Sequence, residues 1–156
     1  MLRCSMIFCL ICVSVFTLGC GSKGIKTDVV TGKVTFNGEV LADASVRFSP
    51  VASGGNIGYG KTDENGVYKL QTLLGEAEAG TTPGDYIITV SKSFNVGTGK
   101  FQEGPDGGPP IEIMDPVEMI PANYSDKTKS ELRFTVVAGK KNEFDIPLEG
   151  TLRTKK

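Results

Sequence analysis

The sequence predicts an all-β protein, a seven-stranded antiparallel β-sandwich that follows an N-terminal signal peptide. The main observation is that apolar and polar residues alternate with a period of two in short runs between residues 30 and 148. The second is that turn-forming pairs rich in glycine, asparagine and proline separate these runs. The composition agrees, because the 156 residues include 20 glycines and 8 prolines but no tryptophan.

The first twenty residues have the pattern of an export signal. Arg3 is followed by an uncharged run over residues 4–18, which is shorter than the ~20 apolar residues of a membrane-spanning helix. The run ends in Leu18-Gly19-Cys20, which resembles a bacterial lipobox, although Thr17 stands where leucine is commonest. This resemblance implies cleavage between Gly19 and Cys20 and a lipid on the Cys20 sulfur. An ordinary cleaved signal and an uncleaved anchor remain as alternatives.

Cysteine usage fits a lipidated chain. All four cysteines lie at or before residue 20, so the mature chain would keep only Cys20 and would form no internal disulfide. Residues 1–19 are thus interpreted as the signal peptide and residues 20–28 as a polar tether. We expect a membrane partner through the lipid on Cys20 and a location in the cell envelope. The lipobox resemblance, with no aspartate at position 21, favours the outer membrane or the periplasmic face.

Seven segments carry the strand pattern, with turn signals between several of them. The first alternates over residues 30–36 and ends at Asn37-Gly38, a strong tight-turn pair. The others are expected at residues 44–49, 58–62, 67–70, 86–91, 132–136 and 144–148, and the last two are expected to form a closing hairpin. The inward positions predict a core of Val34, Phe36, Val46, Phe48, Tyr68, Leu70, Tyr86, Ile88, Val90, Leu132, Phe134, Val136, Phe144 and Ile146.

Two segments fall outside this pattern. Residues 93–122 are rich in glycine and proline, which predicts a mobile insertion that does not continue the sheet and carries little core. A brief edge strand around residues 111–114 is the exception within it. Residues 150–156 are expected to form a basic tail. Loops on a rigid scaffold often carry binding residues, so the insertion is the expected place for partner specificity.

Several motifs resemble the carboxypeptidase regulatory-like domain. They are Val30-x-Gly-x-Val, Asn37-Gly38-x-x-Leu, Thr62-Asp63-x-x-Gly-x-Tyr and Pro83-Gly84-x-Tyr. Later motifs, including residues 120–125, resemble small planctomycete lipoproteins of the same type. The resemblance covers residues 29–149 and implies a transthyretin-like, or prealbumin-like, sandwich. It brings no catalytic residues, since the motifs consist mostly of turn and core positions.

Candidate sites each have a plain structural alternative. Asp63-Glu64-Asn65-Gly66 suggests either a calcium loop or a hairpin turn, and the turn is favoured because later ligands are missing. Asn123-Tyr124-Ser125 fits a glycosylation acceptor, although a chance match is favoured in a bacterial chain. The basic pairs at residues 140–141 and 155–156 are interpreted as solvated. The carboxylates of the insertion, Asp106, Glu112, Asp115 and Glu118, lack the rigid pocket that acid–base catalysis needs.

These patterns favour a binding or spacing protein. The net charge of −1 gives no support to a nucleic-acid partner, and the absence of histidine argues against zinc hydrolases. We therefore expect a non-catalytic envelope lipoprotein with no catalytic residue, metal site or cofactor, whose partner is an envelope protein or a glycan. The alternative is a carbohydrate- or ligand-binding lipoprotein that serves a transport or degradation system. Its sugar platform would need exposed aromatics, for which the candidates are Tyr59, Phe94, Phe101 and Tyr124.

Overall fold

The computed structural model describes residues 26–72 and 80–154. The predicted signal peptide, its cleavage site at Gly19 and Cys20, most of the tether and the last two residues of the basic tail lie outside this part. Within the described part, no helix has the length and apolar character needed to cross a membrane.

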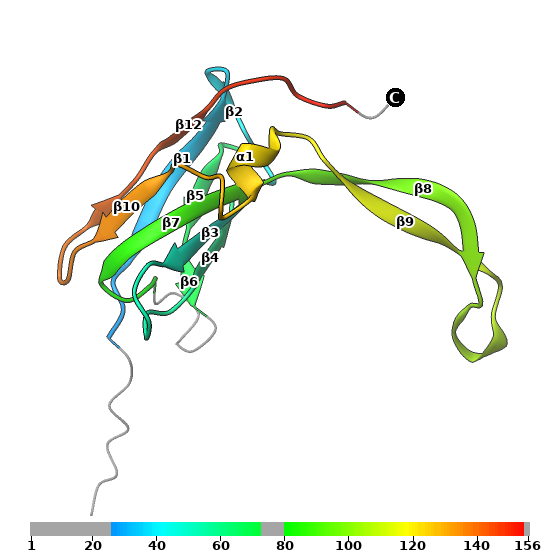
Figure 1. Cartoon of the computed structure of the whole chain (residues 1–156), viewed down its shortest axis with the longest axis horizontal. Coiled ribbons are helices and arrows are strands. Elements are labelled where there is room, and N and C mark those ends of the chain that lie inside the picture. Colours follow the sequence, from blue (N-terminus) through cyan, green and yellow to red (C-terminus); the bar gives the residue numbers. More distant parts are fainter. Residues whose placement is uncertain (1–25, 73–79, 155–156) are drawn as a thin grey trace, which may run out of the picture.

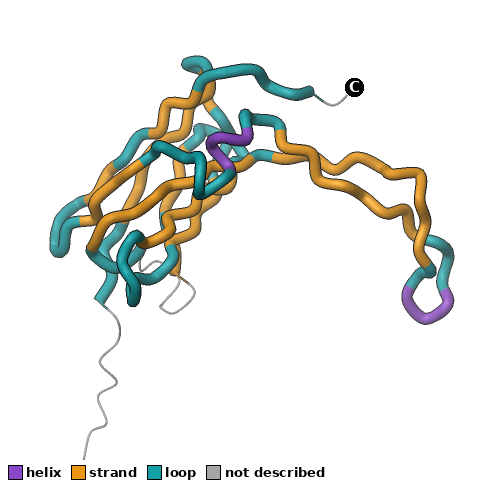
Figure 2. The backbone as a smooth tube through the Cα atoms, viewed as in Figure 1, coloured by secondary structure: helices purple, strands orange, loops and turns teal. Residues whose placement is uncertain are grey.

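The described chain is almost entirely β-structure, which confirms the all-β prediction (Figure 2). One five-stranded sheet surrounds a central strand, β1 (Val30–Phe36). Its neighbours are β2 (Glu39–Val40), β5 (Val67–Lys69), β11 (Asn142–Glu143) and β12 (Ile146–Leu148). The second five-stranded sheet has the order β10 (Arg133–Val136), β7 (Gly84–Ser91), β3 (Ser45–Pro50), β4 (Gly58–Lys61) and β6 (Gln71–Thr72).

The two five-stranded sheets share one hydrophobic core. Alternation along each strand turns every second side chain inward, as in β3, where Val46 and Phe48 are buried while Ser45 and Arg47 are exposed. All of the predicted core residues are buried except Leu132, Phe134 and Phe144, which are partly buried and pack against the core. The core also includes five residues outside the predicted set, namely Val30, Leu41, Ala44, Ile120 and Leu148.

The strand count and the strand directions differ from the prediction. The described residues contain twelve strands where the sequence predicts seven. The antiparallel prediction is wrong at β1, which pairs in parallel with both β11 and β12. The predicted closing hairpin is also wrong, because β10 lies in one sheet and β12 in the other. Asn142 holds the connecting turn, since its side chain accepts from Val137 N at 2.8 Å and donates to Lys140 O at 3.0 Å.

The predicted insertion is ordered as a projecting hairpin, which corrects the expectation of a loop. We call it the arm: β8 (Ser93–Gln102) and β9 (Ile111–Glu118) form their own antiparallel two-stranded sheet, joined at the tip by η1 (Pro105–Gly107). Figure 1 shows the arm extending well beyond the two larger sheets. The turn-forming residues do not prevent pairing, because most of them lie at the tip and at an irregularity between Gly97 and Phe101.

The base of the arm is joined to the rest of the described chain by backbone bonds. Met119 N donates to Lys92 O at 2.7 Å, which closes the hairpin where it leaves the sandwich. Arg153 N donates to Met119 O at 2.8 Å, so the C-terminal segment runs beside this base. The short helix α1 (Ala122–Ser125) follows, and Tyr124 packs against the core. These contacts give the arm a fixed starting point.

Candidate functional site

A groove lies on the outside of the second sheet, where β3 and β4 meet β5. We call it the outer-face groove; it has a volume of about 890 Å³. Its charged and aromatic lining comprises Arg47, Tyr59, Lys61, Asp63, Tyr68 and Lys69. Small polar side chains such as Ser45 and Thr89, and the exposed apolar Val67, complete the lining. The groove therefore combines positive charge with some apolar surface.

Strand register places the groove residues. Arg47 lies directly opposite Tyr59 on β4, so both side chains project from the same outer face. The Arg47 guanidinium carbon lies 5.5 Å from the centre of the Tyr59 ring, a distance that allows a cation–π contact. The ring face of Tyr59 is thus already covered by a cation. A planar cation held in this way suits an acidic group on a ligand.

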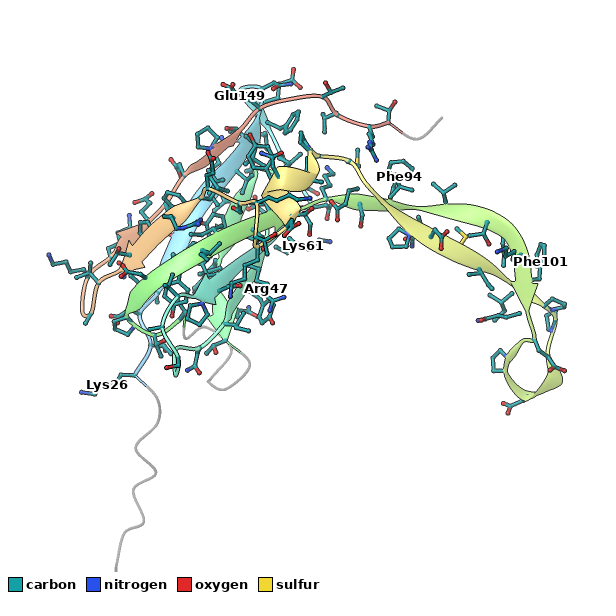
Figure 3. The ribbon with its side chains drawn as sticks, in the orientation of Figure 1. Lys26, Arg47, Lys61, Phe94, Phe101 and Glu149 are labelled. Atoms are coloured by element: carbon teal, nitrogen blue, oxygen red, sulfur yellow. The ribbon has the colours of Figure 1, made fainter. Side chains whose placement is uncertain are left out.

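Lys61 is the second cation that the groove presents at its outer end. Its ammonium lies 2.9 Å from an Asp43 carboxylate oxygen, and both side chains are largely exposed. Hydrogen bonding to Lys61, together with the Lys61 charge, holds the pKa of Asp43 below its usual value. Such exposed pairs are weak, so a ligand carboxylate can share Lys61 at little cost. Figure 3 labels Arg47 and Lys61 on the same side of the sandwich.

The acidic run beside the groove forms a turn, as the favoured interpretation predicted. Asp63 Oδ1 accepts from Asn65 N at 2.9 Å and from Val67 N at 2.8 Å. Gly66 has a φ of +74°, which glycine adopts without strain. Among the described residues, no group of three or more His, Cys, Asp or Glu side chains is arranged to hold a metal. The Asp63 oxygen thus stabilises the turn that connects β4 in one sheet to β5 in the other.

The arm carries much of the exposed apolar surface of the described chain. Phe94 lies opposite Val117, and Val96 lies opposite Asp115, so these four side chains share one face. Continuing the alternation along β9 adds Ile111 and Ile113 to this face. The arm residues Val96, Phe101, Ile111, Ile113 and Met114 are all exposed, and Phe101 is 64% exposed. Exposed apolar surface of this kind is typical of interaction sites.

The arm is also strongly acidic. Residues 93–118 carry five carboxylates and one lysine, a net charge of −4. Glu112 has a local role, because its carboxylate accepts from Gly99 N at 2.9 Å and lies where a side chain on Gly97 would stand. Asp115 is exposed, and one Glu118 oxygen is buried without a hydrogen-bond partner in the described structure. These carboxylates are spread along the arm and do not converge on one pocket.

The predicted aromatic candidates do not form a platform. Tyr124 packs against the core, and its hydroxyl accepts from Glu149 N at 3.2 Å, so the Asn123-Tyr124-Ser125 motif helps to fix α1. Tyr59 and Phe94 are half-buried and lie in different parts of the molecule, the first in the groove and the second on the arm. Phe101 lies far out on the arm (Figure 3). The structure brings none of the four together.

The basic pair at residues 140–141 lies in the turn between the two sheets, as a solvated pair would. Lys141 forms an exposed ion pair with Glu143 at 2.8 Å, and hydrogen bonding to Glu143 raises the pKa of Lys141.

Sequence reasoning missed the outer-face groove. The available signal was the outward position of Arg47 within the β3 alternation, but the partner strand that brings Tyr59 opposite it is set by the fold.

Comparison with known proteins identifies no family for the chain. No protein-family model matches it, and no curated protein matches it. The structure of a 9R-lipoxygenase from Cyanothece PCC8801 is similar with a TM-score of 0.39 and 14% sequence identity. The similar region covers 80% of this chain and 16% of that enzyme's chain. The chain thus spans a small part of the length of the lipoxygenase.

This comparison corrects one expectation from the sequence. The prediction that the chain is not an enzyme no longer stands, because the similar structure is that of an enzyme. A likeness at this TM-score and identity carries no argument for any particular activity of this chain. The lipoxygenase structure therefore assigns neither a reaction nor a substrate to it.

Proposed function

We propose that the protein is a lipid-anchored protein of the cell envelope, held by Cys20, whose sandwich presents the arm to a partner. The observation that carries this proposal is the placement of the two ends of the sandwich. Asp28 pairs with Thr81, just before β7 begins, whereas the arm starts directly after β7 ends. The eight residues of β7 span about 25 Å. Residue 28 and the base of the arm thus lie at opposite ends of this strand.

The nature of the anchor rests on Leu18-Gly19-Cys20 at the end of an uncharged run. Two or three acyl chains on Cys20 would hold the protein on a membrane, since each buried methylene contributes about 0.8 kcal/mol. We also propose a transthyretin-like sandwich of the carboxypeptidase regulatory-like family, on the outer membrane or the periplasmic face. The turn and core motifs and the lipobox resemblance support this assignment.

Fractionation of cells that express the Cys20→Ser variant tests the anchor. We expect the wild-type protein to stay in the membrane fraction in high salt and to have the mass of residues 20–156 plus lipid. The Cys20→Ser variant should be soluble or uncut. Cys12→Ser is the matched control, because it removes a thiol from the predicted signal peptide and should leave the membrane fraction unchanged. Wild-type protein that washes off in salt, or retains residues 1–19, would contradict the proposal.

Replacing the arm tests its role in binding. Residues 94–117 are exchanged for a short Gly-Ser linker that keeps Lys92 bonded to Met119. We expect a melting temperature near that of the wild type, because β8 and β9 pair only with each other among the described strands and no residue from 94 to 117 belongs to the buried core. Partners recovered from detergent-solubilised membranes should be lost. A variant that folds and keeps every partner would place the binding surface elsewhere.

A second candidate is the binding of a carbohydrate or another small ligand in the outer-face groove. The observation that favours it is the combination of Tyr59 with Arg47, Lys61 and small hydroxyl side chains. The cations favour an acidic polysaccharide over a neutral one. Electrophoresis of the protein through gels that contain an acidic or a neutral polysaccharide distinguishes the two ligands, because binding slows the migration of the protein. We expect Arg47→Gln to abolish retention in the acidic gel and Lys140→Gln to leave it unchanged.

A further inference from the structure

The arm has a surface that one copy of the chain leaves uncovered. A two-stranded hairpin is marginally stable in water on its own, and three or more strands or a packed face are normally needed. β8 and β9 pair only with each other among the described strands, and their apolar side chains remain exposed. Backbone bonds join residues 92, 119 and 153 at the base, and Arg153 and Thr154 line a pocket with arm residues no farther out than Gly97 and Met114. An occupant for the rest of the arm is therefore expected.

The charge of the arm limits what this occupant can be. Residues 93–118 have a net charge of −4, whereas the rest of the described chain has twelve basic and eleven acidic residues. Two arms laid side by side would bring two acidic surfaces together, and like charges at an interface are unfavourable. Arm-to-arm pairing is thus disfavoured. A surface that is both cationic and partly apolar is the complementary partner.

The outer-face groove has these properties. It presents Arg47 and Lys61, and its wall includes Val67, which is 43% exposed. Arg47 and Lys61 offer hydrogen-bond donors that suit carboxylates such as Asp115. The exposed Val67 side chain offers contact area to the apolar side chains of β9. The volume of about 890 Å³ gives room for several side chains of a strand.

The shape of the molecule allows two copies to meet in this way. Figure 3 shows the arm leaving the sandwich on the side on which Arg47 and Lys61 are labelled, with its tip turned downward in this view. A second copy turned by a half rotation would lay its arm in the groove of the first copy and receive the first arm in its own groove. Such a twofold exchange closes the assembly at a dimer.

We propose that the arm of one copy docks in the outer-face groove of a second copy, so that two copies clasp each other reciprocally. This proposal rests on the proposed role of the arm in binding and names its partner, but it does not depend on the lipid anchor. The arm exchange buries the apolar face of β8–β9 and pairs its carboxylates with Arg47 and Lys61. The dimer contains two arm-to-groove contacts, so the surface areas that they bury add together. This sum helps the dimer approach the ~800 Å² per partner of a stable interface.

Site-specific cross-linking between two differently tagged copies tests the geometry. One copy carries Gln102→Cys on the arm and the other carries Ser45→Cys in the groove; both positions are exposed and uncharged. The full chain is co-expressed, and the protein is treated with a short bismaleimide. We expect a mixed dimer from the Gln102→Cys and Ser45→Cys pair. Copies without engineered cysteines measure the background cross-linking through the native cysteines at residues 4–20. Repeating the experiment with Cys20→Ser in both copies separates this result from the lipid anchor.

Charge reversal tests the cause of the association. Arg47→Glu with Lys61→Glu should lower the mixed-dimer yield by about tenfold or more, which corresponds to roughly 1.4 kcal/mol. Lys140→Glu with Lys141→Glu makes the same change in net charge away from the groove and should leave the yield unchanged. Combining the reversed groove with an arm that carries Glu103→Lys and Asp115→Lys should restore the yield. Melting temperatures near the wild-type value show that each variant is folded.

Three results would overturn the proposal. The first is a cross-link that forms between two Gln102→Cys copies in preference to the arm and groove pair. The second is a monomer in detergent at low salt, measured by sedimentation, with no specific cross-link. The third is a folded groove reversal that leaves the yield unchanged. A monomer whose groove retains an acidic polysaccharide would assign the groove to that ligand instead.

Discussion

At the scale of single residues, Gly32 shows how closely β1 approaches the segment between β11 and β12. A Cβ atom at this position would collide with the Phe144 carbonyl oxygen and would lie 2.9 Å from the Tyr68 hydroxyl. The same Phe144 oxygen accepts a hydrogen bond from that hydroxyl at 2.7 Å. The absence of a side chain at residue 32 therefore permits the contact that joins β1, β5 and the final segment.

We predict that Gly32→Ala lowers the free energy of unfolding by about 3 kcal/mol or more, because backbone has to move to admit the methyl group. Gly38→Asn is the control. Residue 38 has a positive φ, +84°, but a Cβ atom there would have no other atom within 4 Å, and asparagine tolerates such a backbone. Denaturant unfolding measures both variants. Equal losses for the two would show that the close approach to Phe144 is unimportant.

Tyr68 gives a prediction for alkaline pH. Burial, and secondarily the nearby Asp145 charge, raise the pKa of Tyr68 above the value of about 10 for a free tyrosine. Tyr68 therefore keeps its hydroxyl proton in the folded state at pH values at which the same tyrosine loses it in the unfolded chain. Stability should be insensitive to this group below pH 10 and should fall above pH 10 by up to about 1.4 kcal/mol per pH unit.

Tyr68→Phe is the control for this pH dependence. It removes the titrating hydroxyl and the bond to Phe144 O, so it should cost about 1 kcal/mol at neutral pH. Above pH 10 the difference between wild type and variant should shrink, because only the wild type loses stability through this group. Urea unfolding at several pH values measures both curves. Parallel curves would show that Tyr68 does not titrate differently in the two states.

At the scale of elements, the aromatic cluster between the sheets separates full from partial burial. Phe48 on β3 is fully buried and contacts four aromatic rings, among them Phe134 on β10 at a centroid distance of 6.2 Å. Phe134 is only partly buried, and its ring stacks near Phe144 at 4.8 Å. The sequence pattern treated both Phe48 and Phe134 as equal core residues.

We predict that Phe48→Ala costs about 3–5 kcal/mol, because it removes a fully buried ring. Phe134→Ala should cost less, about 1–3 kcal/mol, since solvent already reaches part of this side chain. Thermal or urea unfolding of the two variants measures the difference. A larger loss of stability for Phe134→Ala than for Phe48→Ala would contradict the conclusion that Phe48 is the more deeply buried of the two side chains.

The difference between prediction and structure is clearest for the strands. Period-two alternation identified β1, β3, β7 and most of the core, because inward residues of a half-buried strand are apolar. Alternation carries no information about which strand lies next to which. The parallel pairing of β1 with β12 joins residues more than a hundred positions apart and depends on the whole fold.

The arm and the groove escaped prediction for related reasons. Glycine and proline in residues 93–122 indicated a loop, whereas they gather at the tip and at the bulge and leave two paired strands. Several apolar side chains of the arm are exposed instead of buried, so the arm lacks the pattern that identifies a core strand. The groove needs Arg47 and Tyr59 on neighbouring strands, and that neighbourhood is set by β3–β4 register.

At the scale of the whole molecule, the sheets should hold together when the arm is cut. Lys100 is exposed on β8, so limited trypsin treatment should cleave there first. The two fragments remain linked, because β10 pairs with β7 and β12 pairs with β1 across the cut. We expect two bands on a denaturing gel and one species by native mass spectrometry. Separation of the fragments under native conditions would show that the arm contributes to the sandwich.

The parallel contact between β1 and β12 has a mechanical consequence. Residue 30 and residue 148 mark opposite ends of this pair of strands, and Figure 3 places Lys26 and Glu149 at opposite ends of the sandwich. Tension applied between these two ends pulls the strands along their length, so the backbone bonds of the pair bear the load together instead of opening one after another. Forced unfolding would then be slow, as it is governed by the unfolding rate. A sandwich with this arrangement is suited to transmit pulling force.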